Sequence, residues 1–288
     1  MNATTRQNDP AGGPGGALPP PAPPTQPPVP PSQPPRRSRL WLLIGSLIVV
    51  PTLLWSVFNV VLLVAHDEKT ITEAVAADGV TVVEVRNPTG RVEVVGSDVE
   101  EITIRAEVSH GLRRTGHGHR TDADRLVIWG TCPVIGSSWC EVKYRIEVPR
   151  DLAVEVRSAT RVELRDLSGP VEARASNGSI ETVGLSGPAV LDSTNDDVTV
   201  DGHRGDDLVV SSSNGDVDVA VEIPPRSIEA RTTNGDVVVA LPPDEMVRYR
   251  VTVESRNGDR TNEVITDPNA DRSIEAKTTN GDATVRYR

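Results

Sequence analysis

The chain is poor in aromatic side chains, which make up 3% of its residues. Its only phenylalanine, Phe58, lies in an apolar run near the N-terminus. Aromatic rings fill much of a wide sandwich core, so any core here must consist of small Val, Ile, Ala and Leu side chains. Two cysteines are too few for a disulfide-rich scaffold. Beyond residue 65, no stretch shows the 3.6-residue apolar period of an amphipathic helix, which indicates an all-β region.

Catalytic and cofactor-binding motifs are also missing. The sequence has no Gly-x-Ser-x-Gly elbow, His-Glu-x-x-His pair, phosphate-binding Gly-Lys-Ser/Thr loop or Gly-x-Gly-x-x-Gly turn. No pair of carboxylates stands out from the general acidity. The one histidine cluster, at residues 110–120, is Gly-rich and basic, and we interpret it as an exposed loop rather than a metal site. We therefore predict a protein that is not an enzyme and has no cofactor, catalytic residue or bound metal.

The N-terminal segment has an unusual composition. Residues 1–39 contain 13 of the 24 prolines. Such a segment cannot bury enough apolar surface to offset its conformational entropy, so we predict a disordered Pro-rich cytoplasmic tail. Polyproline II segments within it could dock a cytoplasmic partner, but a flexible spacer is the simpler interpretation.

A long apolar run follows the tail. Residues 40–65 carry no charge, and as a helix they would be about 39 Å long, enough to cross a bilayer. A cleaved signal peptide and a buried core helix are the alternatives, but the run is long and 39 residues precede it. We predict a transmembrane helix in the cell membrane. Arginines before the run and acidic residues after it favour a cytoplasmic N-terminus and an extracytoplasmic C-terminal region.

Charge is distributed unevenly along the chain. The formal net charge is −11, and residues 1–39 carry four Arg and one Asp, a net of +3. Residues 66–288 therefore carry −11 − 3 = −14. This acidity argues against nucleic acid as a partner.

The two cysteines, Cys132 and Cys140, flank a loop rich in Pro, Gly and Ser between two expected strands. A structural disulfide is the favoured interpretation, in keeping with an oxidising compartment. A metal half-site would need further ligands, and a redox pair usually has the Cys-x-x-Cys spacing.

The region after the apolar run alternates apolar and polar residues, which is typical of strands with one buried face. We expect an irregular β region with the disulfide loop over residues 66–150 and a β-repeat domain over residues 151–288. The repeat is a turn with the pattern Ser/Thr-x-Asn-Gly-Asp/Ser, of which Thr194-Asn195-Asp196-Asp197-Val198 is a variant. The turn residues are Asn177, Gly178, Asn195, Asn214, Gly215, Asn234, Gly235, Asn257, Gly258, Asn280 and Gly281, and successive asparagines are 18, 19, 20, 23 and 23 residues apart.

Two architectures fit these turns. Asn and Gly tolerate the positive φ of tight turns, so the turns could join hairpins of an antiparallel sandwich. Alternatively, each unit of about 20 residues is one coil of a β-solenoid whose stacked turns form an asparagine ladder. The nearly constant period and the small apolar residues favour the solenoid. The aspartates after Asn-Gly raise a calcium hypothesis, but the period is twice that of calcium-binding β-rolls, and we interpret them as solvated turn residues.

These turn motifs resemble a bacterial putative-adhesin family of unknown function with β-strand repeats. The matching blocks are Asn87–Val92, Ser176–Ile180, Ser213–Val219 and Thr232–Val237, and the resemblance extends over about residues 69–288. It implies a membrane-anchored extracytoplasmic domain without catalytic residues, and it connects some members with envelope-stress responses.

The sequence leaves two functions open. The first is an adhesin-like surface interaction or envelope scaffold, with a partner that is an envelope polymer or a surface protein. The second is a signalling component of the envelope-stress response that uses the Pro-rich tail.

Overall fold

The computed structural model describes residues 36–64, 67–87, 89–110, 115–132, 140–244 and 246–288. The Pro-rich tail, apart from its last four residues, and the loop between the cysteines lie outside these ranges.

The helix α1 (Arg36–Val64) contains Pro51 and includes a segment, Leu43–Val60, that is long and apolar enough to cross a membrane. Length and composition are equally compatible with a signal sequence.

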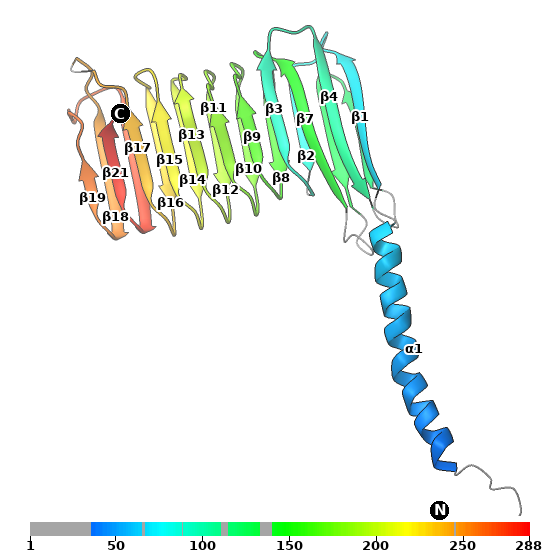
Figure 1. Ribbon diagram of the computed structural model, residues 1–288. Coiled ribbons are helices and arrows are strands. Elements are labelled where there is room, and N and C mark those ends of the chain that lie inside the picture. Colours follow the sequence, from blue (N-terminus) through cyan, green and yellow to red (C-terminus); the bar gives the residue numbers. More distant parts are fainter. Residues whose placement is uncertain (1–35, 65–66, 88, 111–114, 133–139, 245) are drawn as a thin grey trace, which may run out of the picture. The chain divides into compact units, whose positions relative to one another are not determined.

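The rest of the described chain forms two β-sheets (Figure 1). Sheet A has 11 strands, in the spatial order β1 (Asp67–Ala76), β4 (Glu101–His110), β7 (Glu141–Pro149), β3 (Val92–Ser97), β9 (Val162–Arg165), β11 (Ile180–Val183), β13 (Val198–His203), β15 (Val217–Val221), β17 (Val237–Leu241), β21 (Ala283–Tyr287) and β19 (Arg260–Asn262). Sheet B has 10 strands, in the order β18 (Arg250–Asn257), β20 (Ser273–Asn280), β16 (Ser227–Thr232), β14 (Asp207–Ser212), β12 (Ala189–Ser193), β10 (Val171–Ala175), β8 (Ala153–Ser158), β2 (Val82–Asn87), β6 (Arg125–Thr131) and β5 (Gly116–Asp122).

The chain alternates between the sheets and so winds into a solenoid. Each coil gives one strand to sheet B and the next to sheet A, as in β8–β9, β10–β11 and β12–β13, and equivalent strands of neighbouring coils pair in parallel. The solenoid prediction is confirmed. The alternative, an antiparallel sandwich, is wrong, because antiparallel pairing is confined to β1, β4, β5 and their partners among the described strands.

Parallel pairing stacks chemically similar side chains. In sheet B, the first inward position of each strand forms one buried column: Val154, Val171, Ala189, Leu208, Ile228 and Ile274. Burial of apolar side chains stabilises the fold by about 25 cal/mol for each Å² removed from water. The core needs no large rings because the two sheets meet through small aliphatic side chains.

At both ends, the order along the chain differs from the order in space. The coil β2–β3 lies between β6–β7 and β8–β9, and the coil β20–β21 lies between β16–β17 and β18–β19. Sheet A continues past β7 through the antiparallel strands β4 and β1, and β5 pairs antiparallel with β6 at the edge of sheet B. Regular parallel coils are therefore built from residues on both sides of residue 150.

Candidate interaction surface

The repeat turns meet along one edge of the solenoid. Their asparagine side chains form a continuous ladder in which each amide Nδ2 donates to the Oδ1 of the next asparagine in the stack. The five bonds run from Asn195 to Asn177 (3.0 Å), Asn214 to Asn195 (3.2 Å), Asn234 to Asn214 (2.8 Å), Asn280 to Asn234 (2.7 Å) and Asn257 to Asn280 (2.8 Å). The ladder gives the asparagine amides hydrogen-bond partners that water would otherwise have to supply. It also holds the coils in register.

Aspartates form a second column beside the ladder. The backbone N–H of Asp216 donates to the carboxylate of Asp197 at 2.8 Å, and the same bond joins Asp236 to Asp216, Asp282 to Asp236 and Asp259 to Asp282. These bonds use one oxygen of each acceptor carboxylate. Among the described residues, no group of three or more His, Cys, Asp and Glu side chains is arranged to hold a metal ion.

A third column, of buried hydroxyl groups, was not anticipated from the sequence. Before every turn asparagine except Asn177, the Ser or Thr two residues earlier points inward and donates to a backbone carbonyl in the turn of the adjacent coil. Thr232 donates to Gly215 at 2.8 Å, Thr278 to Gly235 at 2.8 Å and Ser255 to Gly281 at 2.7 Å. Ser193 and Ser212 make equivalent bonds to Gly178 and Asp196. The recurrent hydroxyl in the sequence motif was the signal that could have revealed this column.

The turn glycines are needed mainly because the coils approach closely. Positive φ was expected, but of these glycines only Gly235 and Gly281 show it, with φ of 152° and 143°. A Cβ at any of the five turn glycines would lie 2.0–2.4 Å from backbone atoms of a neighbouring turn. The edge is thus filled by bonds between coils, and the predicted turn residues hold neighbouring coils together.

The cysteines form the expected disulfide, Cys132–Cys140, with a Cα–Cα distance of 5.8 Å. The bond joins the chain after β6 to the start of β7, where Thr115 Oγ1 lies 3.1 Å from Cys140 Sγ. Part of the histidine cluster, residues 111–114, lies outside the described residues. His119 lies on β5, with its Nδ1 at 2.9 Å from Glu73 Oε2.

The outer face of sheet B carries two columns of opposite charge. Successive coils place glutamates in one row (Glu84, Glu155, Glu172, Glu229, Glu275) and cations in the next (Arg86, Arg157, Arg174, Arg231, Lys277). A hydrogen bond from Arg86, at 2.5 Å, lowers the pKa of Glu84 below its ordinary value although burial opposes the shift. The repeated pattern Val/Ile-Glu-x-Arg/Lys thus produces a zwitterionic face.

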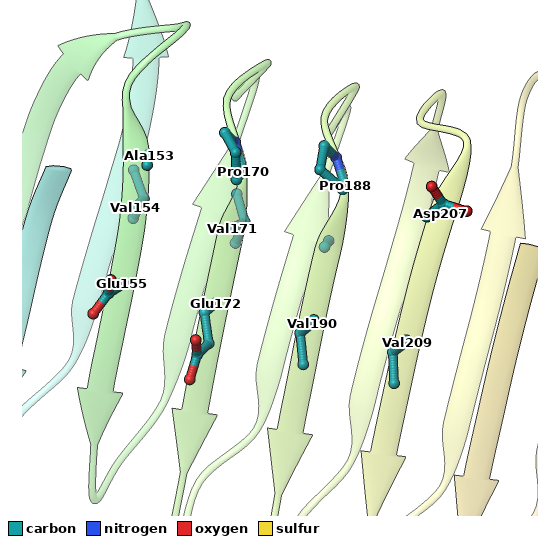
Figure 2. Close-up of a pocket in the computed structure, with 11 residues that line it drawn as sticks. Ala153, Val154, Glu155, Pro170, Val171, Glu172, Pro188, Val190, Asp207 and Val209 are labelled. Atoms are coloured by element: carbon teal, nitrogen blue, oxygen red, sulfur yellow. The ribbon is translucent and has the colours of Figure 1, made fainter. Parts of the chain in front are cut away.

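In the middle of this face, both columns are interrupted. Val190 and Val209 continue the glutamate row, and Asp192 and Ser211 continue the cation row. A mainly apolar groove of about 280 Å³ lies here, formed by strands β8, β10, β12 and β14. Figure 2 shows Val190 and Val209 in line with Glu155 and Glu172, below Pro170 and Pro188. The valines are 43% and 36% exposed, so the groove offers apolar surface to solvent.

A second, polar groove of about 540 Å³ crosses the C-terminal coils at the corner between sheet B and the asparagine edge. Its cations are Arg231, Lys277, Arg256 and Arg260, and most of its other lining residues are Ser and Thr. Neither groove was predicted from the sequence, because each is assembled from strands of several coils.

Residues 152–287 match the family model described as Toastrack DUF4097. The resemblance expected from the turn motifs is therefore confirmed over this part of the chain, and residues 69–151 lie outside the match. No curated protein matches the chain.

Three solved structures illustrate the similarity. A "putative adhesin" from Bacteroides fragilis NCTC 9343 is 11% identical over 76% of this chain and 97% of that chain, with a TM-score of 0.40. A "putative adhesin" from Parabacteroides distasonis ATCC 8503 is 14% identical over 77% and 98%, with a TM-score of 0.37. A "putative cell adhesion protein" from Clostridium sporogenes ATCC 15579 is 10% identical over 77% and 100%, with a TM-score of 0.32. Similarity at this level does not assign a function.

Proposed function

Because residues 152–287 match the Toastrack DUF4097 family, we propose that the chain is a membrane-anchored surface protein whose β-solenoid binds an envelope polymer or another surface protein. The Toastrack family is not an enzyme family, and in this proposal the solenoid has no catalytic activity. It acts through an extended face, as repeat proteins commonly do.

The apolar groove on the outer face of sheet B is the observation that carries this proposal. Charged residues cover most of this face. Val190 and Val209 interrupt them and form a solvent-exposed apolar strip. Exposed apolar surface rimmed by polar residues is typical of interaction sites. Glu155, Glu172 and Asp207 line the same groove. Each of these carboxylates pairs with an arginine of the chain, so the preferred partner has an apolar surface flanked by polar groups.

The placement outside the cytoplasm rests on the helix and on the disulfide. We propose that α1 is a retained anchor with a cytoplasmic N-terminus, since arginines precede it and acidic residues follow it. A structural disulfide between Cys132 and Cys140 is chemically compatible with an oxidising compartment.

Protease treatment of intact cells tests the topology. Protease should remove the region after residue 65 and leave an N-terminal fragment that contains the tail and the helix. A full-length chain that is degraded only after lysis would contradict this placement, and a chain already lacking residues 1–65 would show that the helix is cleaved.

Surface crosslinking of the full-length protein in its own cells, followed by mass spectrometry, tests the interaction. The double variant Val190→Glu/Val209→Glu should lose the captured partners, because it places charge in the apolar groove. The matched control is Val183→Glu on sheet A, where the side chain is 39% exposed. Equal capture by the wild type and the double variant would contradict the proposed face. Partners that disappear only on deletion of residues 1–39 would favour the signalling function instead.

A further inference from the structure

The polar groove at the C-terminal coils has a composition unlike the rest of the face. Of its 12 lining residues, seven are Ser or Thr and four are Arg or Lys. Glu254 is the single acidic residue, so the lining carries a net charge of 4 − 1 = +3. The surrounding region, residues 66–288, carries −14. A volume of about 540 Å³ lies within the usual range of ligand sites, about 300–1,000 Å³.

The cations of this groove fall into two groups. Arg231 forms ion pairs with Glu229 and Glu275, and Lys277 forms ion pairs with Glu254 and Glu275. Within the described part of the chain, Arg256 and Arg260 have no side-chain hydrogen bond or ion pair. The paired cations are fixed by their carboxylates, whereas the two arginines keep their donor groups for another acceptor.

The hydroxyl groups of the groove also fall into two groups, those that donate a hydrogen bond within the fold and those that do not. Thr232, Ser255 and Thr278 donate to turn carbonyls. Thr233 and Thr279 make no side-chain hydrogen bond to described residues, although both line the groove. Two hydroxyls and two guanidinium groups therefore present unused donors to one groove, which is the donor set that an oxyanion requires.

The register of the coils arranges these donors in a line. Asn234 and Asn257 both pair with Asn280, from the two neighbouring coils. The residues one position earlier, Thr233, Thr279 and Arg256, therefore lie in one row across three coils. Neighbouring parallel strands are about 4.8 Å apart. Unused donors thus recur over three successive coils, which suits a ligand whose acceptor groups also recur along a chain.

We propose that this groove binds a linear polymer that carries phosphate groups, with Arg256 and Arg260 as the principal contacts. Guanidinium groups pair with phosphate through two parallel N–H···O bonds, and Thr233 and Thr279 donate to the remaining oxygens. The inference rests on the proposed function and extends it, because it assigns a ligand class to a second site, at the corner of the same solenoid. The apolar groove and the polar groove then contact different parts of the envelope.

Binding of fluorescent polyphosphate to the full-length chain in neutral detergent tests the proposal. At an ionic strength of about 0.15 M, Arg256→Gln/Arg260→Gln should weaken binding by about tenfold or more, since two charge-assisted contacts are lost. The matched control is Arg157→Gln on β8, an exposed arginine of the same face that makes no ion pair with a described residue and lies outside the groove. Melting temperatures of all variants verify that the fold is retained.

The outcomes separate the alternatives. Selective weakening by the double variant, with a shallower dependence of affinity on salt, supports the groove. Equal weakening by Arg157→Gln would show diffuse attraction and would overturn the proposal, as would absence of polyphosphate binding. Binding to mixed micelles with an anionic lipid, but not to polyphosphate, would replace the polymer by a lipid headgroup. If partner capture on cells persists in Arg256→Gln/Arg260→Gln while polyphosphate does not bind, this inference fails and the proposed function stands.

Discussion

His203 is a buried base in an otherwise aliphatic column. It occupies the position taken by Leu185 in one neighbouring coil and Val221 in the other. The side chain is fully buried, and neither ring nitrogen has a hydrogen-bond partner among the described residues. Burial lowers the pKa of His203 to about 4, because the charged ring would lose its hydration.

This residue makes stability depend on pH. In the unfolded chain the imidazole binds a proton with the ordinary histidine pKa of 6.5, whereas in the folded chain it binds one only near pH 4. The free energy of unfolding therefore falls as the pH falls from 6.5 to 4, by about 3 kcal/mol in total, and this contribution is constant outside that window. Denaturant unfolding of His203→Leu at several pH values should lack this loss. His117→Gln on β5 serves as the control, and a loss that persists in His203→Leu would refute the assignment.

The hydroxyl of Thr232 offers a second test at the scale of one residue. Thr232→Val keeps the shape of the side chain and removes the bond to the Gly215 carbonyl. Since the carbonyl then loses a buried donor, the free energy of unfolding should fall by about 1–3 kcal/mol. Thr233→Val, at a neighbouring exposed position without such a bond, should change it by much less. Chemical denaturation of both variants measures the difference.

The asparagine ladder is the element that links the coils at the turn edge. Asn234 donates to Asn214 and accepts from Asn280, whereas Asn257, at the end of the ladder, only donates. Asn234→Ala should therefore lower the melting temperature more than Asn257→Ala, with each lost bond contributing about 0.5–1.5 kcal/mol. Equal effects of the two variants would mean that the ladder bonds do not add to stability.

At the scale of strands and turns, the sequence alone predicts the type of fold but not the grooves or the order of the coils. The turn pattern predicted a solenoid because Asn177, Asn195, Asn214 and Asn234 recur at almost constant spacing, and parallel coils require that spacing. The grooves were not predictable, because each combines strands from four coils. The coil order was also hidden: the Val/Ile-Glu-x-Arg/Lys pattern of β2 is repeated in β8 and β20, so local sequence does not say which strand lies beside which.

At the scale of the whole molecule, the C-terminal end of the solenoid depends on the coil β20–β21, which is inserted between β16–β17 and β18–β19. The strands β18 and β19 pair only with β20 and β21 among the described strands. Removing residues 273–288 should therefore detach residues 250–262 as well, although these residues remain in the chain. Removing residues 242–288 should instead leave an intact stack that ends at β16–β17. Hydrogen exchange tests this: rapid exchange of residues 250–262 in the shorter deletion is expected, and continued protection would contradict the dependence.

The same inserted coil bears on how the protein is made. Synthesis proceeds from the N-terminus, so β18 and β19 leave the ribosome before β20 and β21, the strands they must pair with. Until those later strands arrive, β16 and β17 present open edges, which are templates for unwanted pairing with other chains. A nascent chain that stalls between residues 263 and 272 would keep these edges open. The coil β20–β21 thus covers the edges of β16 and β17 and leaves β18 and β19 as the outermost strands at this end.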